Sequence, residues 1–320
     1  MTRNGLLKAL LVPVTLFLFV ISGFGQKGSG VATRAGHWNP ANSMTVARQG
    51  ACSSQLPDGS VLIAGGSDSH GPLASADLYG TDGNFIAVAP MAAARTAQSC
   101  AALLDGTVLM AGGTASDGST LNSAEIYDMF TGRWTSVGPM SIPRSGAAAA
   151  IMNDGRVLIT GGQSFGVASS SVELYDPAFR SFQALATTMS APRQQHAAIT
   201  LSDGRVLIAG GSNGSVALDS LDLYDPRIQA TSPAGKMLTP RQGLSAATML
   251  DHRVLLAGGS DGTNDLASAE IFDPKTGNLA ATASMISARQ GHLAFRLPNN
   301  NEILLAGGTL NGKPLAAAEV

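Results

Sequence analysis

The sequence predicts an all-β protein, a six-bladed β-propeller with four-stranded antiparallel blades. A Met-x-x-x-Arg element, a glycine pair and an acidic residue before an apolar one recur in phase through six units, with the glycine pairs 47 to 49 residues apart. Glycine contributes 38 of 320 residues, while charged residues make up 13% and aromatic residues 5%. This composition is typical of short strands and tight turns. Repeats of this period indicate units that stack radially and bury their faces against one another.

The first 25 residues form a separate segment with the layout of a secretory signal peptide. Arg3 and Lys8 precede an apolar stretch over 9–24, which ends in small residues. We expect cleavage after Gly25, a short linker at 26–30 and the propeller at 31–320. The mature protein is then expected to be secreted or periplasmic, with no membrane span. The alternative is an uncleaved N-terminal membrane anchor, although the apolar stretch is short for one.

Each unit is predicted to contain four strands, named A to D in chain order. Strand A follows the arginine and is rich in small residues. An Asp-Gly turn, a strong hairpin signal, joins it to strand B in four units. Strand B is a continuous apolar run, and its closing glycine pair suggests that another backbone passes too close for a Cβ atom. The glycine pairs begin at Gly65, Gly112, Gly161, Gly210, Gly258 and Gly307.

The arithmetic of the repeat predicts how the ring closes. Six periods account for residues 31–320, and the sequence stops within strand C of the sixth unit. Residues 31–43 align without gaps on 272–284, which places Trp38 opposite Leu279. We therefore expect an N-terminal strand to close the ring as strand D of the last blade. The length alone would suggest two domains, but the repeat predicts a single domain.

These motifs resemble the kelch repeat: an arginine before strand A, an apolar strand B ending in Gly-Gly, an acid-x-Tyr-Asp strand C and a tryptophan in strand D. The chain is similar to bacterial exported kelch-repeat proteins of the galactose oxidase/kelch-type propeller superfamily. It departs from the pattern in four ways. The histidine that often follows the arginine occurs only as His196 and His292, and tryptophan occurs in two units. In place of Asp-Gly, unit five has Asp251-His252 and unit six has NNNE at 299–302.

The recurring arginines are the first candidate ligand-binding residues, because the topology places them near the central opening. Six guanidinium groups around one axis suit a carboxylate, sulfate or phosphate. The alternative is structural, since an acid recurs in phase with each arginine and six ion pairs would explain every copy. The arginines are Arg48, Arg95, Arg144, Arg193, Arg241 and Arg289; the acids are Asp77, Glu125, Glu173, Asp222, Glu270 and Glu319.

The connections between strands B and C are the second candidate, because they vary on a constant scaffold. They share a face with the connections between strands D and A. Calcium binding at 261–265 is disfavoured, since the segment lacks EF-hand spacing and a closing glutamate. The candidate contact residues in these loops are Asp68, His70, Asp117, Phe165, Asn213, Asp261, Asn264, Asp265, Asn311 and Lys313.

No catalytic machinery is predicted, and no metal or cofactor. The sequence lacks a Gly-x-Ser-x-Gly elbow, a His-Glu-x-x-His motif and a phosphate loop. His196 and His292 occupy the kelch position, for which a structural role on strand A is expected. The four tyrosines all occupy the same strand C position. Cys52 and Cys100 lie on strand A of neighbouring blades, and their side chains point either toward one another or apart. The two alternatives are therefore a disulfide and a pair of buried thiols.

The charge balance narrows the functional classes. The full sequence has a formal net charge of −2, and after signal cleavage 18 basic and 22 acidic side chains remain. Neither form has the excess of basic residues that nucleic-acid binding requires. We expect a monomeric, non-catalytic binding module whose partner, a protein or a glycan, docks on the face shared by the D-to-A and B-to-C connections. The alternative is a sugar-acid-modifying enzyme of the sialate mutarotase kind, with arginines and carboxylates at its centre.

Overall fold

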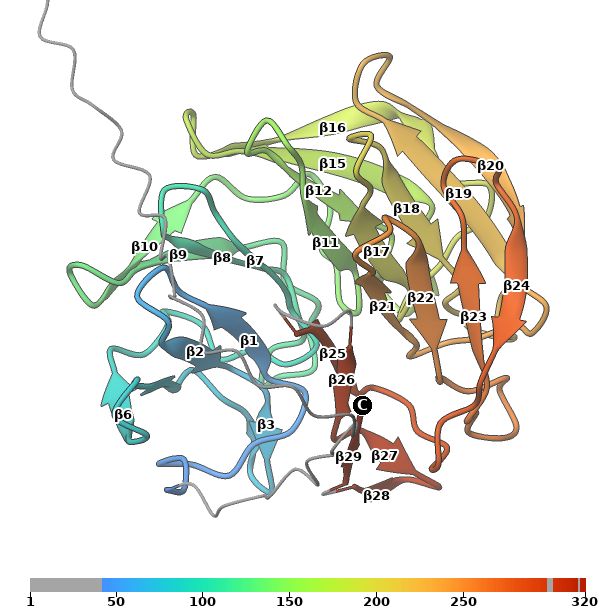
Figure 1. The fold of residues 1–320 in the computed structure, drawn as a ribbon. Helices are drawn as coiled ribbons and strands as arrows, with labels where there is room; N and C mark the ends of the chain where they lie inside the picture. The colour runs from blue at the N-terminus through green and yellow to red at the C-terminus, as the bar shows by residue number, and fades with distance from the viewer. Residues whose placement is uncertain (1–41, 298–301, 316) are drawn as a thin grey trace, which may run out of the picture. The chain divides into compact units, whose positions relative to one another are not determined.

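The protein is described by a computed structural model over residues 42–297, 302–315 and 317–320. These residues form strands and turns and contain no helix. Six of the sheets form blades arranged in chain order around a central axis, from blue at the start to red at the end (Figure 1). The all-β, six-bladed propeller is thus confirmed. The predicted closing strand around Trp38 lies outside the described residues.

The strands of the six blades have the following bounds. Blade one comprises β1 (Cys52–Gln55), β2 (Val61–Ala64), β5 (Ala76–Tyr79) and β6 (Phe85–Val88). Blade two comprises β7 (Ser99–Ala102), β8 (Val108–Ala111), β9 (Ala124–Asp128) and β10 (Arg133–Val137). Blade three comprises β11 (Ala148–Ile151), β12 (Val157–Thr160), β15 (Ser171–Asp176) and β16 (Ser181–Thr188). Blade four comprises β17 (Ala197–Thr200), β18 (Val206–Ala209), β19 (Ser220–Asp225) and β20 (Ala230–Lys236). Blade five comprises β21 (Ser245–Thr248), β22 (Val254–Ala257), β23 (Ala269–Phe272) and β24 (Leu279–Thr282). Blade six has three described strands, β25 (Leu293–Arg296), β26 (Ile303–Ala306) and β29 (Ala318–Glu319).

Each blade is an antiparallel meander with strand A innermost. The order in blade one, β1-β2-β5-β6, recurs in every four-stranded sheet. The inner strands contact one another in sequence, from β1 to β7, β11, β17, β21 and β25 (Figure 1). Three B-to-C connections add short hairpins: β3 (Ser67–Asp68) with β4 (Gly71–Pro72), β13 (Gln163–Ser164) with β14 (Val167–Ala168), and β27 (Thr309–Leu310) with β28 (Lys313–Pro314).

The A-to-B turns adopt the geometry that the Asp-Gly motif predicts. Gly59 has φ +87°, and the Asp58 carboxylate accepts a hydrogen bond of 2.9 Å from the Ser60 N–H. In blade five His252 takes the left-handed position with φ +71°. A non-glycine residue can occupy this region at a modest cost in conformational energy, which explains how the turn survives the substitution.

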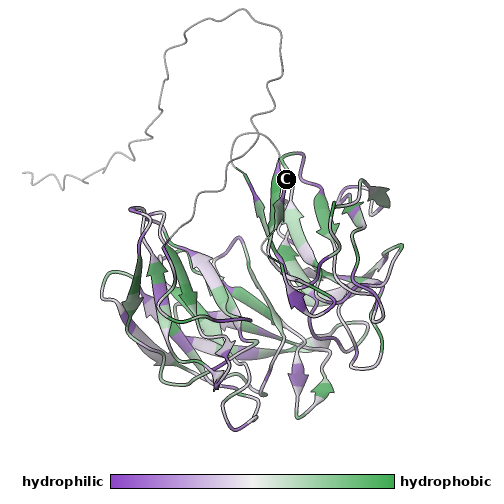
Figure 2. Cartoon of the chain, turned by 90° about the horizontal axis from the view of Figure 1, so that it is seen from below, coloured by the Kyte–Doolittle hydropathy of each residue, from purple (hydrophilic) through white to green (hydrophobic). Residues whose placement is uncertain are grey.

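The core lies between neighbouring blades, where the faces of the sheets meet. All four residues of β8, β12 and β18 are buried, in agreement with the continuous apolar runs of strand B. Figure 2 shows hydrophobic residues concentrated in many of the strands. Three of the four strand C tyrosines pack against the aromatic residues predicted for strand D, as in the 4.9 Å ring contact between Tyr175 and Phe182. Such pairs add to the stabilisation from apolar burial.

The glycine pairs mark close contacts between blades, as predicted. Gly210 has φ +62°, and a Cβ atom there would lie 2.4 Å from the carbonyl oxygen of Arg241 in the next blade. The N–H of Gly211 donates a 2.7 Å hydrogen bond to the same carbonyl. The first glycine therefore lets the next blade approach, and the second glycine binds it.

A disulfide joins the inner strands of blades one and two. Cys52 on β1 and Cys100 on β7 are bonded, with Cα atoms 6.2 Å apart, a separation within the normal disulfide range. Of the two orientations that the sequence left open, the two side chains therefore adopt the one in which they point toward one another. The bond closes a loop of chain across the blade interface, and such a constraint stabilises the fold by restricting the unfolded chain.

Candidate functional site

Each recurring arginine side chain is buried, and the five arginines of blades two to six each join two blades. In blade four the Arg193 guanidinium donates to the carbonyl oxygens of Gly210 (2.9 Å) and Ser220 (3.0 Å) and to the Asp222 carboxylate (2.7 Å). Its own carbonyl oxygen accepts a 2.9 Å hydrogen bond from Gly162 of blade three. The side chain thus ties strands B and C of one blade together while the main chain is held by the preceding blade.

The same ion pair occurs in all six blades, with N···O distances of 2.7 to 2.9 Å. The arginine side chains are at most 1% exposed. Burial lowers the pKa of Arg95, Arg144 and Arg193, and the paired carboxylates of Glu125, Glu173 and Asp222 oppose this effect. A guanidinium stays charged in spite of such shifts. The pairs are Arg48–Asp77, Arg95–Glu125, Arg144–Glu173, Arg193–Asp222, Arg241–Glu270 and Arg289–Glu319.

The spacing of the Met-x-x-x-Arg element follows from the second role of these carboxylates. Glu125 accepts hydrogen bonds from the N–H groups of Ala92 (2.7 Å) and Ala93 (3.3 Å), which lie between Met91 and Arg95. The D-to-A connection therefore wraps around the acid that pairs with its arginine. Met91 is buried at the start of this wrap. A carboxylate with this many donors has little capacity left for a ligand.

These contacts favour the structural interpretation of the six arginines. The guanidinium groups lie inside the blades, bonded to carbonyl oxygens and carboxylates, so they do not present N–H groups to a ligand in the central opening. The proposal that they bind an anion there receives no support from this geometry. The residues that do reach the opening follow the arginines in sequence.

The residues two positions after the arginines lie around the axis and are here called the channel belt; main-chain hydrogen bonds join five of the six in series. These residues have positive φ values and are Gly50, Ala97, Gly146, Gln195, Gly243 and Gly291. The Gly146 N–H donates to the Ala97 carbonyl oxygen at 2.8 Å, and Gln195, Gly243 and Gly291 continue the series at 2.9, 2.8 and 2.8 Å. Four hydrogen bonds thus connect blades two to six at the mouth of the channel.

A cavity of about 540 Å³ opens at this mouth and is the candidate functional site. Its volume lies in the range of small-ligand sites. No lysine, arginine, aspartate or glutamate lines it; Leu244, His196 and belt glycines complete the wall. The side chains that supply hydrogen-bonding groups to it are Gln49, Ser67, Thr96, Gln195, Gln290 and Thr309.

His196 and His292 are buried strand A residues, in line with the structural role expected for them. The Nε2 atom of His196 lies 2.7 Å from the Thr160 hydroxyl, and that of His292 lies 2.8 Å from the Ser245 hydroxyl. Neither Nδ1 atom has a hydrogen-bond partner among the described residues. Burial, reinforced by the charges of Arg193 and Arg144, lowers the pKa of His196 to about 3, and burial with the charge of Arg289 lowers that of His292 to about 4. Both rings are therefore neutral near pH 7.

The predicted B-to-C loop residues do not converge on one site. The carboxylates of Asp68, Asp117 and Asp261 accept hydrogen bonds from their own loops, and these bonds lower their pKa values. Asn213 caps its loop in the same way. His70, Asn264, Lys313 and Phe165 are exposed, Phe165 at 84%.

Asp265 differs from the other loop acids because it links two blades. Its carboxylate accepts hydrogen bonds from the Gln290 side chain (2.8 Å) and from the Asn311 N–H (2.6 Å). Gln290 lines the mouth cavity, so Asp265 positions one of its walls. Asp265 and Asn311 are the loop candidates that the structure brings together.

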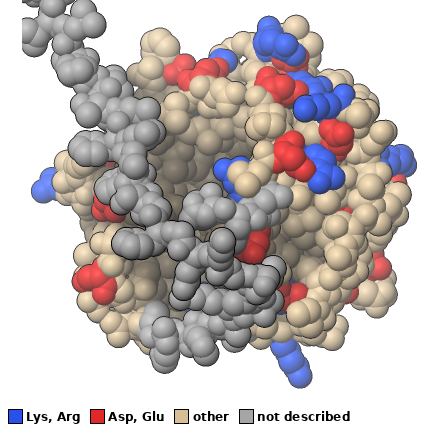
Figure 3. Space-filling model, viewed as in Figure 1, with Lys and Arg blue, Asp and Glu red and all other residues tan. Residues whose placement is uncertain are grey.

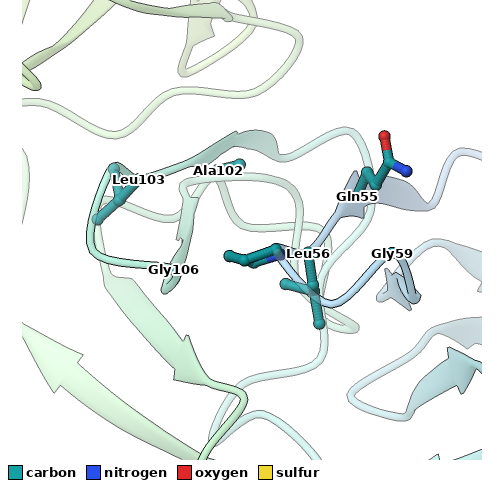
Figure 4. Close-up of a pocket in the computed structure, with 7 residues that line it drawn as sticks. Gln55, Leu56, Gly59, Ala102, Leu103 and Gly106 are labelled. Atoms are coloured by element: carbon teal, nitrogen blue, oxygen red, sulfur yellow. The ribbon is translucent and has the colours of Figure 1, made fainter. Parts of the chain in front are cut away.

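The A-to-B turns on the opposite side offer weaker candidates. A cavity of about 400 Å³ lies between blades one and two, where Leu56 and Leu103 approach the turn glycines Gly59 and Gly106 (Figure 4). Its lining includes no titratable side chain. Ion pairs such as Asp154–Arg156 and Asp203–Arg205 occupy other turns at 2.7 Å. Figure 3 shows that many charged groups on the visible face are neighbours of opposite sign.

The described part of the chain holds no cluster of three or more histidine, cysteine, aspartate or glutamate residues suited to a metal ion. Within the same residues, no helix has the length and apolar character needed to cross a membrane.

Comparison with known proteins identifies the family. Residues 97–308 match the family described as the KLHDC2/KLHL20/DRC7 Kelch-repeats domain, and the match covers 212 of the 320 residues. The chain belongs to the kelch-repeat family. No curated protein matches this kelch chain in sequence.

Solved structures share the fold, and 810 chains match it. One is the structure of YjhT, with a TM-score of 0.69 and 15% sequence identity over 86% of this chain and 95% of YjhT. At this identity the likeness concerns the fold alone. The kelch fold carries diverse activities, so the function has to be argued from the site.

The mouth residues of this kelch propeller were absent from the sequence-based candidates. The position after each arginine is occupied only by glutamine, threonine or serine: Gln49, Thr96, Ser145, Gln194, Gln242 and Gln290. This regularity is a sequence signal of polar groups near the axis: Gln49, Thr96 and Gln290 line the mouth cavity, whereas Ser145 is buried and bonded to Thr114. The charged arginines beside these positions are the stronger sequence signal of a ligand site.

We expect Arg193→Gln and Asp222→Asn each to lower the free energy of unfolding by about 3–5 kcal/mol, because either change leaves a buried partner uncompensated. The control is Arg205→Gln, which breaks the ion pair with Asp203 at side chains that are 27% and 44% exposed. Its effect should be within about 1 kcal/mol. Chemical denaturation measures both. Equal effects of the buried and exposed changes would contradict the anchoring role.

We expect stability to fall as the pH decreases from 6.5 toward 3. Between pH 6.5 and about 4 the unfolded state protonates His196 and His292 while the folded state does not, and for His196 this difference continues to about pH 3, so protons favour unfolding. Each histidine contributes a loss of about 1.4 kcal/mol per pH unit. His196→Gln, which copies Gln98 at the equivalent position, should flatten the pH dependence of unfolding. His70→Gln in an exposed loop should leave the slope as it is; an unchanged slope in both variants would refute this assignment.

Proposed function

We propose that this kelch propeller is an exported, non-catalytic binding module that takes an uncharged ligand, a glycan or a segment of a protein, at the channel mouth. The observation that carries the proposal is the complete pairing of the six arginine–acid sites, which leaves an uncharged cavity of about 540 Å³. Loops on a rigid scaffold commonly carry binding functions, and a concave site with a few polar groups is the usual form of a ligand site.

The enzymatic alternative, chemistry on a sugar acid, has less support. It needs a cationic group for the substrate carboxylate and a free acid or base near it. The arginines are bonded inside the blades, the recurring acids are bonded to them, and His196 beside the cavity is neutral with a pKa of about 3. Uncharged amide and hydroxyl groups suit recognition better than proton transfer.

Export is supported by the signal-like segment at 1–25 and by the disulfide between Cys52 and Cys100, since disulfides persist in oxidising compartments. When the full chain is expressed in a Gram-negative bacterium, we expect a processed form that begins at Gln26 and is recovered from the periplasm or the medium, with no free thiol. N-terminal sequencing and thiol titration measure this. A full-length chain in the cytosol with two free thiols would contradict export, and one in the membrane fraction would indicate an uncleaved anchor.

Binding is tested with residues 26–320 on a glycan microarray and a peptide array. We expect specific binding that Gln195→Glu weakens at least about tenfold, because a charge at the exposed rim must be desolvated when an uncharged ligand is bound. Thr131→Glu, in an exposed C-to-D turn on the opposite side, serves as the control and should bind as the parent does. Retained binding in Gln195→Glu, or loss only in Thr131→Glu, would place the ligand elsewhere.

A further inference from the structure

The channel belt is open on both sides of Gly50. Four of its links are formed, from Ala97 to Gly291 through blades two to six. Among the described residues, the Gly50 N–H and C=O groups, the Ala97 N–H and the Gly291 C=O have no hydrogen-bond partner. Gly50, Ala97 and Gly291 are all exposed residues. Two donors and two acceptors of the main chain are therefore available at blade one.

The cavity lies over this open part of the belt. Seven of its eleven lining residues belong to blades six, one and two. Four of these seven are Gln49, Ser67, Thr96 and Thr309, whose side-chain polar groups make no hydrogen bond to the described residues. Free side-chain groups and free main-chain groups thus occur together in one sector of the mouth.

The chemistry of the opening favours hydroxyl groups. Each break in the belt separates a carbonyl oxygen from an N–H, so a group that fills it must donate to one and accept from the other. A hydroxyl does both through a single atom. Glutamine, serine and threonine side chains also donate and accept, so the lining matches several hydroxyl groups without a preference for charge.

The lining is less suited to a protein partner. Binding hot spots between proteins are rich in tryptophan, tyrosine and arginine, and interfaces are enriched in aromatic residues and methionine. None of these residue types lines the mouth cavity. An anionic sugar is also disfavoured, because its carboxylate would find no cation in the lining.

We infer that the sector around Gly50 is a subsite for a neutral saccharide, whose hydroxyl groups complete the channel belt between Gly291 and Ala97. The inference rests on the proposed binding function and specifies its ligand. The saccharide accepts hydrogen bonds from the Gly50 and Ala97 N–H groups and donates to the Gly291 and Gly50 carbonyl oxygens. Gln49 and Thr96 hold the remaining hydroxyl groups.

The test uses residues 26–320 and a glycan array of neutral, sialylated and uronate-containing oligosaccharides, followed by calorimetry with the strongest neutral binder. We expect neutral oligosaccharides to bind. Thr96→Val should raise the dissociation constant about tenfold, the loss expected for a hydrogen bond in a partly buried site. Gln49→Leu should act similarly. Thr131→Val, the same change in an exposed turn on the opposite side, should bind as the parent does, and all three variants should keep the parent melting temperature.

Amide hydrogen exchange provides a readout of the belt itself. In the free protein we expect the Gly50 and Ala97 amides to exchange faster than those of Gly146, Gln195, Gly243 and Gly291, and to become protected when the oligosaccharide is bound. Binding of acidic glycans only, binding of peptides only, or neutral binding that is insensitive to Thr96→Val and gives Gly50 no protection would overturn the inference while leaving a binding module. Absence of binding to every glycan and peptide probe would refute both.

Discussion

The buried pair of arginine and acid is the interaction on which the rest of this propeller depends. In each blade it connects strand B to strand C and fixes the D-to-A connection through the carboxylate. In blades two to six the arginine also offers its carbonyl oxygen to the preceding blade, as Arg193 does for Gly162. A buried charge is stable only with its partners in place, so all of these contacts have to form together. The glycine pair belongs to the same unit, because a side chain at Gly210 would collide with the Arg241 carbonyl.

This arrangement determines what the molecule offers to a ligand. The charges that recur in every blade are used inside the blades, and the residues that follow the arginines supply uncharged groups to the channel mouth. A repeat protein built in this way separates its scaffold from its binding surface. Changes at Gln49 or Thr96 alter the mouth without touching the anchor, whereas changes at the arginines affect the fold. This separation supports the proposed binding function.

The blades are equivalent in sequence and differ in how they meet. Between blades three and four, His196 bonds to Thr160; between blades one and two, Gln98 takes the histidine position and donates to Ala64, and a disulfide adds a covalent link. The belt hydrogen bonds run from blade two to blade six and stop on either side of blade one. Among the described residues one sector of the mouth therefore has free main-chain groups, and this asymmetry is the basis of the proposed ligand subsite.

The repeat, the six blades, the strand order, the Asp-Gly turns and the common spacing of the arginines and acids could all be predicted from the amino-acid sequence. These features depend on short-range periodicity and on contacts that every unit repeats. Tertiary structure decided where the guanidinium groups point, that Cys52 faces Cys100, and that the acids of loops such as 117–119 cap their own turns. The packing of neighbouring blades also forms the mouth cavity, where residues from equivalent positions of different blades lie together. Such a site arises from how neighbouring units pack around the axis, and no single repeat contains the information that defines it.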